Sequence, residues 1–504
     1  MNPNILLFTD TGDHTFLYRP GGVYKVASIL RTLGYNVLVN HFSTGYTRKG
    51  WQEIVKKYVS KDLIWIGVST TFLTYPIDMW KQWKEQFDNS EKKFIDIDRY
   101  IPFQLNSKDK NKEKIVFDKE ILEFLQQIFN VPVVVGGSQL TRNENINELY
   151  SLNKKIIFVP GYGEDILQNL TESLINTGTW TDTRKNVYQF DREKFRRQTY
   201  IWTKEDLIEP EENLPLEINR GCAFKCGYCT YDHIGQRNHY KFPTTLYDEI
   251  IRNYNNYGTY SYSMLDDLYN DSNEKVYDLY ENVFKKLPFK IEWSAYVRLD
   301  LFWRYPEQIE LLQQSGLKAC SFGIETLNDR AGKLVGKGLG KDKILSTLKK
   351  TMSTWKDDVL GYGLWIAGLP YEPIDSWHDT VKLQKKENIT RGDAWNWLWI
   401  NRNKNNMHLS AIDLSPEKYG YSFDEFGWKH EMGYNEKNSK DFCDYYKNLN
   451  QGKINSHFAY DIFRSAGFTH HDLATNKVNW SMRETVVLEK SIKKRNSFNQ
   501  KFIT

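Results

Sequence analysis

Short apolar runs alternate with helical patterns along most of the 504-residue chain, and this alternation constrains the fold more than any other feature. In the first part of the chain the runs lie at 4–10, 35–42, 63–70, 131–137 and 156–164. Apolar residues with helical spacing separate them, as between Val23 and Leu33. Val- and Ile-rich runs that alternate with helices are typical of a parallel sheet covered on both faces. Residues 1–175 are therefore predicted to form an α/β, doubly wound, Rossmann-like domain.

The alternation stops in residues 176–213 and then resumes. The stretch 176–213 lacks sustained periodicity, which predicts a linker. Six further apolar runs follow at 215–220, 262–267, 290–297, 318–324, 359–368 and 394–400. Strand and helix patterns alternate here, so residues 214–401 are predicted to form a partial (β/α)6 barrel with its chemistry at the C-terminal strand ends. Residues 402–504 are predicted to form a small α+β cap or substrate region.

Charge and hydropathy exclude several classes of function. The formal net charge is +4, from 68 basic and 64 acidic residues, and this near balance does not favour a nucleic-acid partner. No apolar run approaches the length that spans a bilayer, and the first residues lack the pattern of a signal peptide. We therefore expect a cytoplasmic protein with no membrane partner.

Three of the five cysteines form one close group. Cys222, Cys226 and Cys229 are spaced C-x3-C-x2-C directly after the first predicted barrel strand. A zinc site is one interpretation, but such a site normally uses four Cys or His ligands, and only His233 lies near as a fourth. Three thiolates would instead leave one iron of a 4Fe-4S cluster without a protein ligand, and an open iron is a site for chemistry.

This cysteine loop, placed after the first strand of a six-unit barrel, resembles the hallmark of radical S-adenosylmethionine (SAM) enzymes. The resemblance covers residues 213–375 and implies that the three cysteines hold a 4Fe-4S cluster whose open iron is chelated by SAM. It also implies that an electron cleaves SAM to a 5′-deoxyadenosyl radical, which abstracts hydrogen from the substrate. The expected partners are an electron donor such as flavodoxin or ferredoxin and a small-molecule or peptide substrate.

Residues at successive strand ends of the barrel extend the resemblance. The candidates for SAM binding are Tyr228, Asp266, Asp267, Arg298, Glu325 and Gly368. In the family, the backbone at the position of Tyr228 approaches the adenine, and the position of the two aspartates provides polar groups for the methionyl amine. Glu325 stands where the family often places a polar contact to SAM. A single carboxylate here could simply cap the next helix, but the joint pattern favours SAM binding.

The domain before the barrel resembles the cobalamin-binding group of radical SAM enzymes. Its candidate ligand contacts are Ser69, Thr70, Gly136, Gly137, Gly161 and Gly163. Glycines after strands let a backbone approach a flat ligand, although they can also be ordinary turn residues. The usual cobalt-ligating motif D-x-H-x-x-G is absent, because Asp10 and His14 have the wrong spacing. We therefore expect that His14 does not ligate cobalt, and a domain that binds no cobalamin is the alternative.

The resemblance implies a cobalamin-dependent enzyme, most often a methyltransferase that acts on an unactivated carbon or phosphorus centre. One alternative is a radical SAM rearrangement, oxidation or cyclisation without cobalamin, and another is a non-catalytic protein that senses cobalamin or redox state. Methylthio transfer would need a second cluster, for which the two remaining cysteines do not suffice. Aromatic residues of the C-terminal tail either line a substrate pocket or form core, namely Tyr419, Tyr421, Phe423, Phe426 and Trp428.

Overall fold

The computed structural model describes most of the chain, which divides into two compact units. The first comprises Met1–Ile208 with Leu488–Thr504, and the second comprises Glu209–Val487. The residues described are 3–9, 19–41, 53–54, 56–69, 126, 129–137, 140, 155–183, 187–210, 212–230, 239–402, 409–449, 455–475 and 488–503. No helix within these ranges is long and apolar enough to cross a membrane.

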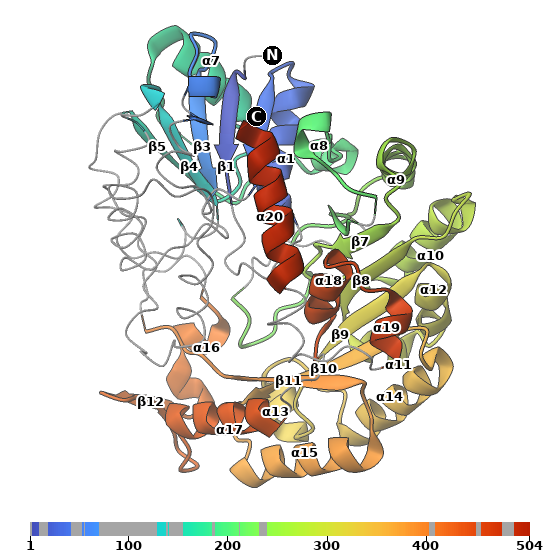
Figure 1. Cartoon of the computed structure of the whole chain (residues 1–504). Helices are drawn as coiled ribbons and strands as arrows, with labels where there is room; N and C mark the ends of the chain where they lie inside the picture. The colour runs from blue at the N-terminus through green and yellow to red at the C-terminus, as the bar shows by residue number, and fades with distance from the viewer. Residues whose placement is uncertain are drawn as a thin grey trace. The chain divides into compact units, whose positions relative to one another are not determined.

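A five-stranded parallel sheet forms the core of the first unit (Figure 1). Its strands are β1 (Ile5–Phe8), β2 (Val37–Asn40), β3 (Trp65–Ser69), β4 (Val133–Gly137) and β5 (Ile156–Pro160). The helical segments of this unit are α1 (Gly21–Thr32), α7 (Leu167–Thr177), α8 (Arg192–Arg197), the 3-10 turn η4 (Lys204–Asp206) and α20 (Leu488–Ile503). The sheet order β2-β1-β3-β4-β5 is that of a doubly wound fold with its switch point between β1 and β3. The predicted Rossmann-like fold is confirmed.

Two segments outside residues 1–175 pack on this unit. Arg31 of α1 donates two hydrogen bonds to the Asp206 carboxylate, at 2.8 and 2.9 Å. From α20, the Phe502 carbonyl accepts a hydrogen bond from the Tyr58 hydroxyl. The stretch 176–213, for which the sequence predicts a linker, therefore supplies buried contacts, and the C-terminal helix belongs to the first unit.

A six-stranded parallel sheet forms the second unit, in the order β11-β10-β9-β8-β7-β6. Its strands are β6 (Leu214–Leu216), β7 (Ser261–Met264), β8 (Glu292–Val297), β9 (Leu317–Glu325), β10 (Leu360–Ala367) and β11 (Gly392–Trp397). The helical segments between them are α9 (Pro243–Tyr257), α10 (Asn273–Asn282), η5 (Phe284–Lys286), α11 (Leu299–Arg304), α12 (Gln308–Gln314), α13 (Asp329–Leu334), α14 (Lys341–Trp355) and α15 (Ile374–Glu387). Because neighbouring strands follow one another in the chain, the sheet is the predicted (β/α)6 arrangement.

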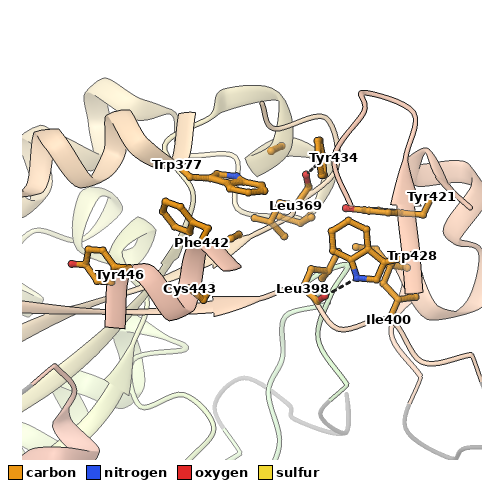
Figure 2. Close-up of a cluster of buried hydrophobic side chains, with 14 of the residues drawn as sticks. Leu369, Trp377, Leu398, Ile400, Tyr421, Trp428, Tyr434, Phe442, Cys443 and Tyr446 are labelled. Atoms are coloured by element: carbon orange, nitrogen blue, oxygen red, sulfur yellow. Dashed lines mark hydrogen bonds between the residues drawn. The ribbon is translucent and has the colours of Figure 1, made fainter. Parts of the chain in front are cut away.

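The C-terminal part of the second unit adds a small antiparallel hairpin and short helices. These elements are α16 (Ala411–Leu414), η6 (Pro416–Tyr419), β12 (Tyr421–Asp424), β13 (Gly427–His430), α17 (Glu436–Leu449), α18 (His457–Ser465) and α19 (His470–Ala474). The hairpin, α17 and α15 share one apolar cluster with the ends of β10 and β11 (Figure 2). In this cluster the Trp428 indole donates to the Leu398 carbonyl at 2.9 Å. Tyr421 and Trp428 are thus core residues, whereas Phe423 and Phe426 are exposed.

The two faces of the second sheet contact different helices. Phe322 of β9 packs its ring against Phe302 of α11 and Trp355 of α14. The opposite face meets α18, where Asp461 accepts hydrogen bonds from Ser263 and Ser294 at 2.7 Å each. Alternate residues of a strand point to opposite faces, so the outer face packs on the crossover helices and the inner face packs on α18. Figure 1 shows α18 beside β8 and β9.

Candidate active site

The chain that leaves β6 is fixed by one buried aspartate. The Asp266 carboxylate accepts hydrogen bonds from the backbone N–H groups of Ile218, at 3.2 Å, and Asn219. Burial raises the pKa of Asp266 to about 7, while Lys275 and these two N–H groups favour its ionised form. The Asn219 side chain continues the network by donating to Asp271 at 3.1 Å. Asp266 therefore holds the start of the cysteine loop, and its contact with a methionyl amine stays a prediction.

The three cysteines lie together on this loop, and all three are partly exposed. Backbone hydrogen bonds shape the loop: the Phe224 N–H donates to Cys222 Sγ at 3.5 Å, and the Cys229 N–H donates to the Cys226 carbonyl at 3.0 Å. Gly227 fastens the loop to its surroundings, since its N–H donates to the Val335 carbonyl at 3.0 Å. The remaining cysteines of the chain, by contrast, are buried in β9 and α17.

A cation and an anion lie next to the cysteine loop. Arg298, at the end of β8, donates through Nη1 to Cys226 Sγ at 3.3 Å. Burial raises the pKa of the Cys222 thiol, the charges of Asp267 and Cys226 raise it further, and Arg298 opposes them. Asp267 is thus close enough to affect the pKa of Cys222. The two predicted SAM residues Asp267 and Arg298 are brought to the same place as the cysteines.

This donor set fits a 4Fe-4S cluster. Three thiols on one loop supply three iron ligands, and the guanidinium beside Cys226 offsets the negative charge of the thiolates. Each thiolate of such a cluster binds a different iron, so the thiols need not surround one point. Within the described ranges, no group of three His, Cys, Asp or Glu side chains could hold a single metal ion. His233, the fourth ligand that zinc would need, lies outside the described residues.

Glu325 lies at the same edge of the second sheet, at the end of β9. It ends β9 with a φ of 69°, a left-handed conformation that a residue with a side chain adopts only when its surroundings enforce it. Its carboxylate lies 3.4 Å from Lys337 Nζ. The neighbouring Tyr228 is half-buried, and desolvation together with the charges of Glu325 and Cys226 raises the pKa of Tyr228 well above its ordinary value. Tyr228, Glu325 and the cysteines are therefore brought together, and Lys337 is a member that the sequence did not indicate.

Gly368 ends β10 but faces the C-terminal part of the unit. Its φ is 94°, and a Cβ there would lie 2.6 Å from Ser439 Oγ and 2.7 Å from the Trp428 ring. Its carbonyl accepts a hydrogen bond from the Tyr421 hydroxyl at 2.6 Å. Close packing against the hairpin and α17 therefore accounts for this glycine, and its contact with SAM stays a prediction.

Glu372, just beyond β10, is a fully buried carboxyl group. Its Oε1 accepts hydrogen bonds from Thr326 at 2.5 Å and Ser376 at 3.3 Å, and the Trp377 side chain also donates towards the carboxylate. Burial raises the pKa of Glu372 to about 8, although these donors favour the charged form. At neutral pH the group is therefore mostly protonated.

This pKa predicts a pH-dependent stability. The folded state holds the Glu372 proton more tightly than the unfolded state does. The protonated group therefore makes its full contribution to the free energy of unfolding below about pH 4.5, and this contribution is lost as pH rises towards 8. Over that interval the free energy of unfolding should fall by up to about 1.4 kcal/mol per pH unit relative to the Glu372→Gln variant. Urea unfolding at pH 5, 6.5 and 8 measures this difference. Glu387→Gln, at the exposed last position of α15, should follow the wild type, and parallel profiles for wild type and Glu372→Gln would contradict the prediction.

The strand-end residues of the first unit also lie along one edge. Ser69 pairs with Gly136 across β3 and β4, and Gly137 bridges to Gly161. A Cβ at Gly161 would lie 2.1 Å from the Val187 carbonyl oxygen, so a neighbouring segment covers this glycine. Among the described residues, the atom nearest to a Cβ at Gly136 would be the Val159 carbonyl oxygen at 3.7 Å, which is an ordinary contact. Thr70 and His14 lie outside the described residues, and Gly163 makes only ordinary contacts.

Comparisons with known proteins agree with this geometry. Residues 216–383 match the radical SAM superfamily. The chain is 24% identical over 172 residues to an uncharacterized methyltransferase, PH0819, of Pyrococcus horikoshii, and 22% identical over 264 residues to the anaerobic magnesium-protoporphyrin IX monomethyl ester cyclase of Cereibacter sphaeroides. These matches cover 34% and 48% of this chain, and only 36% and 41% of the relatives.

Two solved structures share the fold over most of the chain. The radical SAM methyltransferase TsrM of Kitasatospora setae aligns with a TM-score of 0.58 at 15% identity, over 83% of this chain and 77% of TsrM. The cobalamin-dependent radical SAM enzyme OxsB aligns with a TM-score of 0.56 at 13% identity, over 83% of this chain and 56% of OxsB. With the cysteine loop at the edge of a six-stranded parallel sheet, these findings identify residues 216–383 as a radical SAM region, in a chain whose fold resembles that of cobalamin-dependent radical SAM enzymes.

Proposed function

We propose that this radical SAM enzyme binds a 4Fe-4S cluster, SAM and cobalamin, and transfers a methyl group to an unactivated centre of a small-molecule or peptide substrate. The observation that carries the proposal is the loop with three partly exposed cysteines, which has the charged residues Asp267, Arg298 and Glu325 around it. An external electron donor such as flavodoxin or ferredoxin completes the system.

The residues of the chain have separable tasks in this proposal. Cys222, Cys226 and Cys229 hold the cluster, which when bound supplies the electron that cleaves SAM. Asp267 and Glu325 offer carboxylates that can accept hydrogen bonds from an amine or from hydroxyl groups of SAM. Fixed polar groups of this kind orient a ligand, and burial around them limits the access of water.

The methyl transfer and the cobalamin rest on the first unit and on the relatives. A cobalamin-bound TsrM structure and an aqua-cobalamin-bound OxsB structure share this fold, and TsrM and PH0819 are both described as methyltransferases. In the first unit, Ser69 and Gly136 pair at the carboxyl ends of β3 and β4, the edge at which a doubly wound sheet binds its ligand, and this supports the proposed cobalamin. The match to a cyclase favours a second candidate function, a radical SAM cyclisation.

Anaerobic reconstitution with iron, sulfide and hydroxocobalamin tests the proposal. Reduced protein should retain the corrin after gel filtration and should convert SAM to 5′-deoxyadenosine and S-adenosylhomocysteine. Formation of 5′-deoxyadenosine without bound corrin would contradict cobalamin-dependent methyl transfer and favour a cobalamin-independent reaction such as cyclisation. Bound cofactors with neither product would favour a non-catalytic sensor.

A variant of Asp267 tests the proposed SAM site. Asp267→Ala should weaken SAM binding about tenfold, because a charge-assisted hydrogen bond contributes roughly 1.5–3 kcal/mol. Isothermal titration of anaerobic, cluster-loaded protein measures the affinity, and the iron content should stay at the wild-type level. Asp379→Ala, an exposed aspartate on α15, is the matched control and should bind SAM normally. Unchanged affinity in Asp267→Ala would remove this residue from the site.

A further inference from the structure

Arg298 is held in one position by contacts on several sides. Its Nε and Nη2 donate to the two oxygens of Asp300 at 2.9 Å each, and Nη2 also lies 3.5 Å from the Gly336 carbonyl oxygen. Its Cζ lies 4.0 Å from the ring centre of Phe224, on the cysteine loop. The remaining nitrogen, Nη1, donates to Cys226 Sγ at 3.3 Å. Nearly all of its donors are engaged within the protein, which fixes the direction of the contact with Cys226.

The register of β8 explains why the guanidinium reaches this sulfur. Arg298 directly follows β8 and precedes α11. Its backbone N–H donates to Asn270 Oδ1 at 2.8 Å, which ties the strand end to the segment after β7. The side chain is only 7% exposed, so the charge acts in a region where water screens it weakly.

We infer that Arg298 is a positioning residue that raises the reduction potential of the cluster through its charge and its hydrogen bond to Cys226. The inference rests on the proposed function, because it requires the cluster. When one electron enters the cluster, the cluster and its thiolates become more negative and no bond forms or breaks. A cation beside a thiolate stabilises the reduced form more than the oxidised form, and hydrogen bonds to the sulfur act in the same direction.

Asp300 gives the inference a second, opposite prediction. Its negative charge lies on the far side of the guanidinium and partly cancels the field of Arg298. Removal of the positive charge should therefore lower the reduction potential, and removal of the negative charge should raise it. If Arg298 only held the cysteine loop in place, its replacement would cause loss of iron, and the two substitutions would not shift the reduction potential in opposite directions.

Redox titration of the reconstituted full-length protein, with dithionite as reductant and electron paramagnetic resonance as readout, tests the inference. Arg298→Gln should make the equilibrium constant for reduction about tenfold smaller, which is about 59 mV for a one-electron couple. Arg298→Lys keeps the charge and should shift the midpoint less, whereas Asp300→Asn should shift it upward. Arg304→Gln removes an exposed arginine at the end of α11, the helix that follows Arg298, and should leave the midpoint unchanged.

The outcomes separate this inference from the proposed function. A wild-type protein that binds no cluster would overturn both. A wild-type cluster with the same midpoint in Arg298→Gln, or a downward shift in Asp300→Asn, would overturn the inference alone. If the Arg298→Gln variant loses its iron, the Asp300→Asn variant provides the test: an upward shift of its midpoint potential supports the inference, and a downward shift or no shift overturns it.

Discussion

Replacement of Cys222, Cys226 and Cys229 by alanine should reduce the iron of the reconstituted protein from about four atoms per chain to almost none. The reason is that in the proposed function these three thiolates are the protein ligands of the cluster, and the loop has no other sulfur to substitute for them. Iron and sulfide analysis with visible absorption measures the loss, and cleavage of SAM should disappear with it.

The two core cysteines provide the matched control. Cys320 and Cys443 are buried in β9 and α17, and burial raises the pKa of both thiols, so they are small apolar side chains rather than ligands. The double variant Cys320→Ala, Cys443→Ala should keep its full iron content. Iron retained in the triple variant, or lost in this double variant, would show that the ligands have been assigned wrongly.

The strands were predictable because their chemistry is local. The five strands of the first sheet consist mainly of apolar residues, whose burial between layers requires no knowledge of distant contacts. The predicted runs extend beyond several strands, as at 156–164 against the observed Ile156–Pro160. The predicted runs are longer because the chain leaves the sheet at glycines and polar residues near the strand ends. Apolar composition alone does not indicate where the hydrogen bonds of the sheet end.

The partners within the site were not predictable in the same way. Arg298 and Cys226 are 72 residues apart, and nothing in either segment specifies that the side chains meet. The resemblance predicts that Asp266 contacts SAM, which stays a prediction, whereas nothing in the sequence indicated that its carboxylate also holds the backbone before the cysteines. Strand-end position therefore predicts which residues gather at the edge, whereas the direction of each side chain depends on long-range packing.

Alternate residues of β8 link the site to the helix that covers the inner face. Ser294 donates a hydrogen bond to Asp461 of α18. The ring of Tyr296 contacts the ring of His457 edge-on, with 4.3 Å between the ring centres. Arg298, directly after the strand, donates to Cys226. These three positions share one face because the side-chain period of a strand is two residues. The same face thus carries the contact with α18 at one end of the strand and the contact with the cysteine loop at the other.

Asp461 is therefore expected to stabilise the second unit strongly, and Asp461→Ala should lower its free energy of unfolding by about 3 kcal/mol. The carboxylate accepts hydrogen bonds from Ser263 and Ser294 at 2.7 Å and from the Asn213 amide at 3.1 Å. Alanine would leave these buried groups without their acceptor and would create a cavity between α18 and strands β7 and β8. Urea unfolding followed by tryptophan fluorescence measures the change, since Trp293 lies buried in β8 beside Ser294.

Asp461→Asn and Asp441→Ala separate the hydrogen-bond network from a general effect of charge. The asparagine keeps the size of the side chain and one acceptor oxygen, so it should lose less than half as much stability as alanine. Burial raises the pKa of Asp461 to about 7, so part of the charge is already absent at neutral pH and its further loss costs little. Asp441 is an exposed aspartate of α17 paired with Lys437, and its removal should change stability by less than about 0.5 kcal/mol. Equal losses in Asp461→Ala and Asp441→Ala would mean that α18 is not anchored to the sheet through this carboxylate.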